Sequence, residues 1–261
     1  MTYFILQILP YIAVAIFVVG IVYRIARWFK ARIVHNIVLT PAPTTKSGAA
    51  IRYITEIAFF KSLFKGDKSL WVAAWIMHVT LAGIIAGHIV GFVFLGKQFV
   101  YIGFSEGTSK YLSELFGTAF GIIIAVTLLY LLYRRFAVHE VKISSYVADY
   151  LHLLLLLGIV SAGNFMRLVA GYSVDYRVAK QYFAELLTFQ PITFDPQMNI
   201  VFVIHVLLVQ ILIIILPFSK LLHIPGIFVN RWIIDRSYVD PDPGMPGAKP
   251  GSQSSIKTEG V

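Results

Sequence analysis

Residues 70–95 read LWVAAWIMHVTLAGIIAGHIVGFVFL, and residues 199–223 read NIVFVIHVLLVQILIIILPFSKLLH. Each stretch is long enough to cross a bilayer as a helix, which takes roughly 20 apolar residues. Neither contains an aspartate or a glutamate, yet each contains two histidines, which are His78, His88, His205 and His223. Polar side chains are costly inside a membrane, so four imidazoles there require a specific reason.

The whole chain has the composition of an integral membrane protein. Charged residues make up 13% of it, whereas soluble proteins carry roughly 25%. Five segments are apolar enough to span a bilayer, and they are Tyr3–Tyr23, Leu70–Leu95, Leu115–Tyr133, Tyr150–Ala170 and Asn199–Leu222. The sequence therefore predicts an all-α integral membrane fold with five transmembrane helices.

The distribution of lysine and arginine predicts the orientation. Seventeen of these residues lie in the loops 24–68 and 134–142 and from residue 220 onward, and five lie on the opposite side. Since basic residues accumulate in cytoplasmic loops, we expect the N-terminus outside and the C-terminus in the cytoplasm. This indicates a multi-pass protein of the cell's inner (cytoplasmic) membrane, surrounded by lipid bilayer. These loops explain the net charge of +9, and no basic helix or aromatic RNA-binding motif indicates nucleic acid.

The spacing of the four histidines predicts two pairs. His78 and His88 are 10 residues apart, about 80° short of three helical turns, and His205 and His223 are 18 residues apart, or five turns. Each helix thus presents two imidazoles on one side, at separations of roughly 15 Å and 27 Å along its axis. The helices run in opposite directions. His78 is therefore expected opposite His223 near the cytoplasm, and His88 opposite His205 toward the outside.

Two axial imidazoles per iron are typical of an electron-transferring b-type haem, because they leave no open coordination position. The chain has no cysteine, which excludes cysteine-ligated iron–sulfur clusters, thiolate zinc sites and covalent haem attachment. We therefore interpret residues 1–235 as a five-helix membrane cytochrome b domain, a di-haem bundle with two haem b. Its unequal histidine separations require tilted helices or tilted haem planes. Residues 236–261 are expected to form a disordered cytoplasmic tail.

A second class of function is also compatible with the histidines, namely a proton or ion transporter with a histidine relay and no haem. Divalent metal transport would require carboxylates beside them, and the two histidine-bearing helices have none. Glycines recur every four residues at Gly83, Gly87 and Gly91, which lets either a macrocycle or another helix approach closely. Pro217 is expected to kink the last turns of the fifth helix, and Ser219 to satisfy a carbonyl freed there.

Two further polar residues lie on the fourth helix. Arg167, near the outer end, either pairs with a haem propionate or a quinone carbonyl, or extends to the interface as a snorkelling arginine. His152 is expected to make a structural hydrogen bond.

These motifs resemble the gamma subunit of respiratory nitrate reductase. The resemblance covers roughly residues 1–230 and rests on His-x9-His, His-x17-His and the closing segment PFSKLLHI at residues 217–224. The stretches SAGNFMR at 161–167 and LTFQP at 187–191 look more like a branch of that family. This branch contains the cytochrome b subunits of sulfite-reduction-associated (Dsr) and heterodisulfide-reductase-like membrane complexes.

The resemblance implies two bis-histidine b haems, a quinol site beside the outer haem, and a cytoplasmic iron–sulfur partner subunit at the inner haem. Terminal catalysis would reside in that partner, and this chain would oxidise quinol or reduce quinone. Gly87, directly before His88, matches the family pattern. The family's quinol-site lysine falls near Thr108, so Lys110 is the closest lysine in this chain. A haem-bearing assembly anchor without a quinone site is a third class that fits the same motifs.

Overall fold

The computed structural model describes residues 1–30, 45–193, 199–223 and 225–228. Within these ranges it is all-helical, and five helices are long and apolar enough to cross a membrane, which confirms the five predicted spans. They are Phe4–Lys30, Lys68–Phe94, Glu106–Ala137, Val147–Leu168 and Ile200–Phe218. The third span begins nine residues before its predicted start. The prediction began later because the first two turns of this helix are polar and do not belong to the apolar run. The predicted tail, residues 236–261, lies outside the described residues.

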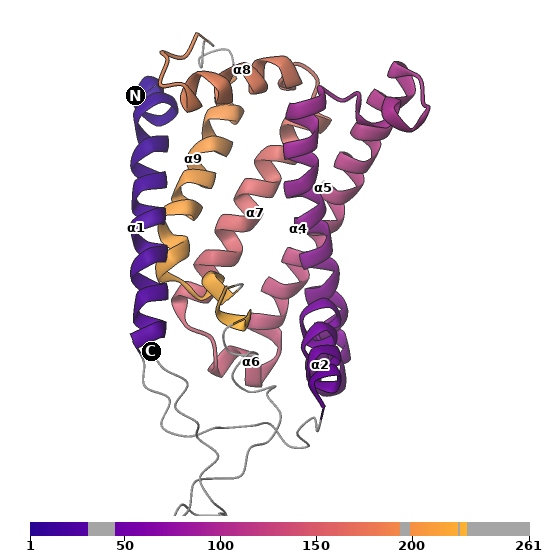
Figure 1. Cartoon of the computed structure of the whole chain (residues 1–261), viewed down its shortest axis with the longest axis vertical. Coiled ribbons are helices and arrows are strands. Elements are labelled where there is room, and N and C mark those ends of the chain that lie inside the picture. Colours follow the sequence, from indigo (N-terminus) through magenta and orange to yellow (C-terminus); the bar gives the residue numbers. More distant parts are fainter. Residues whose placement is uncertain (31–44, 194–198, 224, 229–261) are drawn as a thin grey trace, which may run out of the picture.

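The five spans form one bundle (Figure 1). They are α1 (Leu9–Lys30, preceded by the π-helical turn η1, Phe4–Ile8), α4 (Lys68–Phe94), α5 (Glu106–Ala137), α7 (Val147–Leu168) and α9 (Ile200–Ile215). They pack in the order α4, α5, α7, α9, α1. Among the described residues, the two histidine-bearing helices α4 and α9 do not pack closely against each other.

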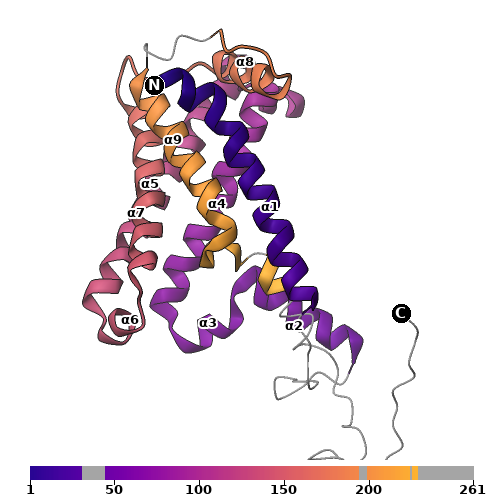
Figure 2. The ribbon, with the colours of Figure 1, turned by 90° about the vertical axis from the view of Figure 1, so that its left-hand side faces the viewer.

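Short helices cover the two ends of the bundle. Those at one end are α2 (Lys46–Phe59), α3 (Lys61–Gly66) and α6 (His139–Ile143); those at the other are η2 (Gln98–Ile102) and α8 (Tyr176–Leu187). Figure 2 shows α2 and α3 at the foot of the bundle and α8 above it. The N-terminus lies at the α8 end (Figure 1). Which end faces the cytoplasm stays a prediction from the basic residues, most of which belong to the α2 end.

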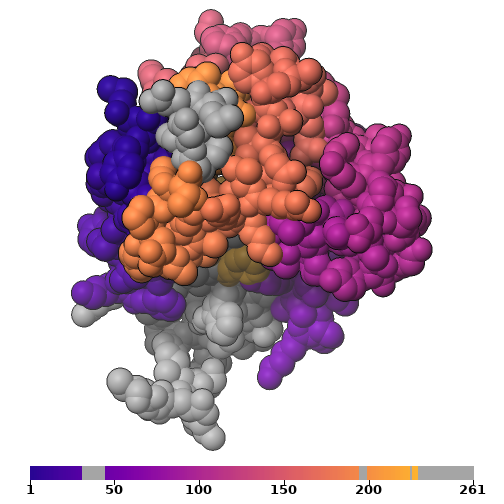
Figure 3. Space-filling model, turned by 90° about the horizontal axis from the view of Figure 1, so that it is seen from above, coloured from indigo at the N-terminus to yellow at the C-terminus, as the bar shows by residue number. Residues whose placement is uncertain are grey.

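The helix α8 was not predicted, and it covers the N-terminal end of the bundle. Seen from above, it lies between the first turns of the chain and the connection from α4 to α5 (Figure 3). Its buried face packs on Leu6 and Phe202 through Tyr182 and Leu186. The Tyr182 hydroxyl donates a hydrogen bond to the Leu6 carbonyl (3.0 Å). Burial of this phenol raises the pKa of Tyr182 and leaves it a neutral donor.

The regular α-helix of the fifth span ends at Ile215, before the predicted end at Leu222, and the expected disturbance at Pro217 is confirmed. Two 3₁₀ turns follow, η4 (Leu216–Phe218) and η5 (Lys220–Leu222). The break occurs at Pro217, which has no N–H to continue the helical ladder. As expected, the Ser219 hydroxyl donates to a carbonyl at the break, that of Leu216 (3.0 Å). The calculation of five full turns between His205 and His223 is therefore wrong, because the helix does not continue that far.

Asp67 caps the N-terminus of α4. Its carboxylate accepts hydrogen bonds from the Leu70 backbone N–H (2.9 Å), the Ser69 hydroxyl (2.9 Å) and the Arg134 guanidinium (2.6 Å). These bonds lower the pKa of Asp67 to about 2, with the largest contribution from the Leu70 N–H and smaller ones from Ser69 and Arg134. The cap also joins α4 to α5, because Arg134 belongs to the last turn of α5.

We expect Asp67→Asn to lower the melting temperature at neutral pH, because buried Arg134 loses its carboxylate partner. The depressed pKa fixes the pH dependence. The carboxylate stabilises the fold fully above its ordinary pKa of 3.8 and ceases to do so as the pH falls through about 2. The gap in melting temperature between wild type and variant should therefore be constant near neutral pH and should disappear in acid. Thermal unfolding in detergent at several pH values measures it, and a gap that persists at the acid limit would contradict the assignment.

Candidate functional site

The structure brings His78 and His223 together, although 145 positions separate them in the chain. Their Nε2 atoms lie 3.4 Å apart, their ring centroids are 5.7 Å apart, and the ring planes meet at 86°. His78 lies on α4, and His223 follows directly after η5. The turns that follow Pro217 thus place the His223 imidazole beside α4.

Three of the four histidines are oriented through Nδ1. A carbonyl oxygen can only accept, so each of these rings carries its proton on Nδ1 and a lone pair on Nε2. Histidines that bind metal are typically oriented in this way, with the opposite nitrogen free for the metal. The bonds run from His78 to the Ala74 carbonyl (2.7 Å), from His88 to Ile84 (2.7 Å) and from His205 to Ile159 on α7 (3.0 Å).

His88 on α4 and His205 on α9 are the predicted second pair, and both lie nearer to α8 than the first pair. Among the described residues their rings make no hydrogen bond or ring contact with each other, so this pairing stays a prediction. The His88 ring also meets Phe92 edge-on, with centroids 5.9 Å apart. On the other side, a Cβ added to Gly163 would lie 3.5 Å from Cε1 of His205, an ordinary van der Waals contact. An alanine would therefore also fit at this position, and the direct support that α7 gives to the His205 ring is the Ile159 carbonyl.

The three glycines of α4 have different surroundings. A Cβ at Gly83 would collide with the Phe120 ring of α5, and one at Gly91 would lie 3.0 Å from the Tyr176 ring of α8. A Cβ at Gly87 would meet nothing within 4 Å. Helix packing therefore accounts for Gly83 and Gly91, whereas Gly87 leaves open space beside His88.

The donor set and its surroundings fit a haem held by two imidazoles. Each pair combines one histidine of α4 with one of α9 or of the segment that follows it, and α4 and α9 are not packed together in the part of the chain that the structure describes. Within the same ranges, no group of three or more His, Cys, Asp and Glu could hold a metal ion by side chains alone. A haem iron needs only two such ligands.

The distance within the first pair bears on the same fit. Two metal–imidazole bonds of about 2.0 Å place the nitrogens about 4 Å apart. The observed 3.4 Å is slightly shorter, so the rings would have to separate by roughly half an ångström to hold an iron between them.

Arg167 and Lys110 lie away from the described contacts of the histidines. The Arg167 guanidinium lies over Gly117 of α5, where an added Cβ would come within 2.7 Å of it. It approaches the Glu114 carbonyl at 3.4 Å. One turn earlier, Asn164 donates to the Gly121 carbonyl (2.8 Å). These contacts join α7 to α5. Lys110 is exposed on the first turns of α5.

Sequence reasoning missed the residues that support the first pair. Phe60 adopts a left-handed conformation (φ 48°) between α2 and α3 and packs edge-on against His78, with centroids 5.1 Å apart. Trp71 and Trp75 hold this segment by donating to backbone carbonyls at the end of α2. The predicted hydrogen bond of His152 is not found among the described residues, where its ring is half-buried on α7.

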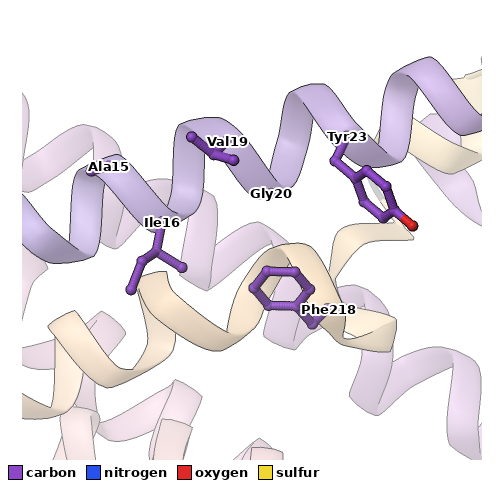
Figure 4. Close-up of a pocket in the computed structure, with 6 residues that line it drawn as sticks. All are labelled: Ala15, Ile16, Val19, Gly20, Tyr23 and Phe218. Atoms are coloured by element: carbon purple, nitrogen blue, oxygen red, sulfur yellow. The ribbon is translucent and has the colours of Figure 1, made fainter.

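An apolar pocket of about 410 Å³ lies between α1 and η4 (Figure 4). It is lined by Ala15, Ile16, Val19, Gly20, Tyr23 and Phe218. Among these side chains only Tyr23 has a polar atom, and Figure 4 shows its hydroxyl pointing away from Phe218. The pocket contains none of the predicted site residues, so it is separate from the histidine pairs.

Comparison with known proteins gives the chain a family. Residues 48–239 match the model of the nitrate reductase gamma subunit family, and this range contains all four histidines. The chain is 27% identical to the Hdr-like menaquinol oxidoreductase cytochrome b-like subunit of Archaeoglobus profundus, over 93% of this chain and 84% of the relative. Its identity to the protein of the same description in Archaeoglobus fulgidus is 28%, over 85% and 76%.

A third relative connects the chain to the nitrate reductases themselves. It is the nitrate reductase gamma chain of Bacillus subtilis, 26% identical over 66% of this chain and 78% of the relative. The resemblance predicted from the sequence is therefore confirmed in both of its parts, the nitrate reductase gamma subunits and the Hdr-like cytochrome b subunits. Because the matched range covers well over half of its residues, the chain belongs to the nitrate reductase gamma subunit family.

Proposed function

We propose that this chain is the di-haem b membrane subunit of a respiratory oxidoreductase complex, in which it exchanges electrons between the quinone pool and a cytoplasmic iron–sulfur partner subunit. The observation that carries the proposal is the approach of the His78 and His223 Nε2 atoms to 3.4 Å. The relatives are described as cytochrome b-like subunits of menaquinol oxidoreductases and as a nitrate reductase gamma chain. Those descriptions support electron transfer within a membrane complex.

In this proposal the four imidazoles would hold the two haem irons. His78 and His223 hold one haem and His88 and His205 the other, and Gly87 leaves room for the macrocycle beside His88. The Ala74, Ile84 and Ile159 carbonyls keep the Nδ1 protons of three rings in place, so that the Nε2 lone pairs would be free to bind iron. When bound, haem b supplies one-electron redox chemistry. Two protein ligands per iron leave no position for oxygen, which favours electron transfer.

The polarity of the complex follows from the orientation. The α2 end carries most of the basic residues, so we place it in the cytoplasm, where the partner subunit would dock. Quinol would then react at the α8 end beside His88 and His205. Two cations are proposed for this quinol site. Lys110 is the lysine nearest to the position of the family's quinol-site lysine, and Arg167 would pair with a haem propionate or a quinone carbonyl. The proposal assigns terminal catalysis to the partner subunit.

The full chain purified in detergent from haem-replete cells should contain about two haem b, since each iron takes two of the four imidazoles. A pyridine haemochrome assay gives the ratio of haem to protein, and a reduced-minus-oxidised spectrum identifies the b type. A haem-free preparation would end the proposal and favour the histidine-relay transporter, which predicts a colourless protein. Two haems that quinol does not reduce would favour the assembly anchor.

A further inference from the structure

His223 is held differently from the other three histidines. His78 and His88 lie within α4 and His205 within α9, where the helical ladder fixes the backbone. His223 instead follows two short 3₁₀ turns beyond the break at Pro217, and it begins a new helical stretch to which residues 225–228 also belong. Such turns have poorer hydrogen-bond geometry than an α-helix. Side-chain anchors in these turns therefore contribute to the position of this imidazole.

One anchor is an ion pair between Lys220 and Asp149. The Lys220 Nζ lies 3.0 Å from the Asp149 Oδ2, although 71 positions separate the two residues. The Asp149 side chain is 7% exposed and lies in the first turn of α7, where it also accepts from the Tyr146 backbone N–H (3.0 Å). The Tyr146 ring lies 4.8 Å from the same Nζ. Lys220 is thus held by a carboxylate and an aromatic face, both fixed at the start of α7.

The spacing of Lys220 transmits this anchor to the histidine. A 3₁₀-helix has three residues per turn, so residues three apart lie one above the other. Lys220 begins η5, and His223 is the residue that closes it. Between them, Leu222 is 5% exposed and packs into the protein. Tethering Lys220 to α7 therefore limits the rotation that would carry the His223 ring away from His78.

We infer that Asp149 and Lys220 are positioning residues for His223, and that their ion pair holds this imidazole opposite His78. The inference rests on the proposed function, because it takes His78 and His223 as the ligands of one haem. Residues that orient metal ligands typically contribute roughly 10–100-fold to metal affinity. Loss of the ion pair should therefore weaken one haem site and spare the other.

Asp149 and Lys220 carry opposite charges. Comparing variants of the two residues therefore distinguishes an effect on the position of His223 from a purely electrostatic effect on the haem. Asp149→Asn removes a negative charge near the haem, and Lys220→Met removes a positive one. If the pair acted only through its field, the two variants would shift the midpoint potential of that haem in opposite directions. If it positions His223, both variants shift the low-spin EPR signal of the same haem in the same direction and lower its occupancy. The double variant should then resemble each single variant rather than their sum.

The experiment uses the full chain in detergent, with haem-to-protein ratio, redox titration and EPR for each variant. The second haem, that of His88 and His205, reports on folding within the same sample. Glu106→Gln is the matched control, because it breaks an exposed ion pair to Lys97 (2.8 Å) at the α8 end. We expect it to leave both haem signals unchanged.

Three results would overturn the inference: both haem signals unchanged in both variants, opposite potential shifts with unchanged EPR signals, or equal loss of the two haems in Lys220→Met. If Asp149→Asn alone loses both haems, the cap of α7 has failed, and Lys220→Met decides, since the Lys220 side chain is 65% exposed and caps no helix. The proposed function fails separately, through a wild-type protein without haem.

Discussion

Alanine in place of His78 or His223 should remove one haem and leave the other in place. Each imidazole supplies one of the two protein bonds to the same iron, so either change leaves that iron with a single protein ligand. The ratio of haem to protein should fall from about two to about one in both variants. The haem that remains should be the same in both, with an unchanged midpoint potential, and quinol should still reduce it. Haem assay, EPR and redox titration of the two variants provide the measurement.

His152→Ala is the matched control for these variants. His152 is also a histidine within a span, it is half-buried, and no hydrogen bond joins it to any other described residue. It should retain both haems. The pairing would be refuted if His78→Ala and His223→Ala lost different haems, or if His78→Ala lost the same haem as His205→Ala.

The five spans were predictable because hydropathy over some 20 residues is a strong signal. The boundaries were less so. The third span begins at Glu106 rather than Leu115, because Ser105 caps the helix by accepting from the Thr108 N–H (3.2 Å), and that signal is unrelated to hydropathy. The helix α8 was missed for a similar reason. Its buried residues form one face of a mixed sequence, so no long apolar run marks it.

The histidine pairs show which parts of the sequence argument were robust. The prediction that His223 lies opposite His78 used only the direction of the two helices and the end at which each residue lies. The structure brings these two residues together. The angular calculation assumed a continuous helix through Pro217 and failed there. A pairing inferred from the directions of the helices stays correct when the last turn is broken. A pairing inferred from the angle between two residues requires a continuous helix.

The supporting contacts could not have been predicted. Asp149 and Lys220 meet across 71 positions, and either residue alone is typical of a helix end near a membrane surface. Phe60 contacts His78 from a left-handed backbone position between α2 and α3, which no local sequence signal marks. Such contacts depend on the packing angles of helices that a single sequence does not specify. The Nδ1 bonds of His78 and His88 are an exception, because a carbonyl four residues earlier is always present in a helix.

We expect His88→Ala and His205→Ala to lose the other haem and to abolish quinol oxidation altogether. Their pair lies at the α8 end, the side predicted to face outward, and the proposed quinol site is beside it. Without this haem, the remaining one would lie too far from the quinol to accept its electrons. The measurements are haem content, rapid-mixing reduction by a soluble menaquinol analogue, and steady-state transfer to an artificial acceptor. In His78→Ala, by contrast, the quinol should still reduce the outer haem while steady-state transfer stops.

This difference between the two pairs has an energetic consequence. If quinol releases its protons outside while electrons pass inward from the His88 pair to the His78 pair, turnover moves charge across the bilayer. Each charge is worth roughly 2.3 kcal/mol per 100 mV of membrane potential. Wild-type protein in sealed vesicles should therefore slow as an opposing potential is applied, and an ionophore should restore the rate. If the haem left in His88→Ala is still reduced rapidly by quinol, then the quinol site lies beside the His78 pair. In that case electrons would cross little of the membrane, and the predicted orientation of the reaction would be wrong.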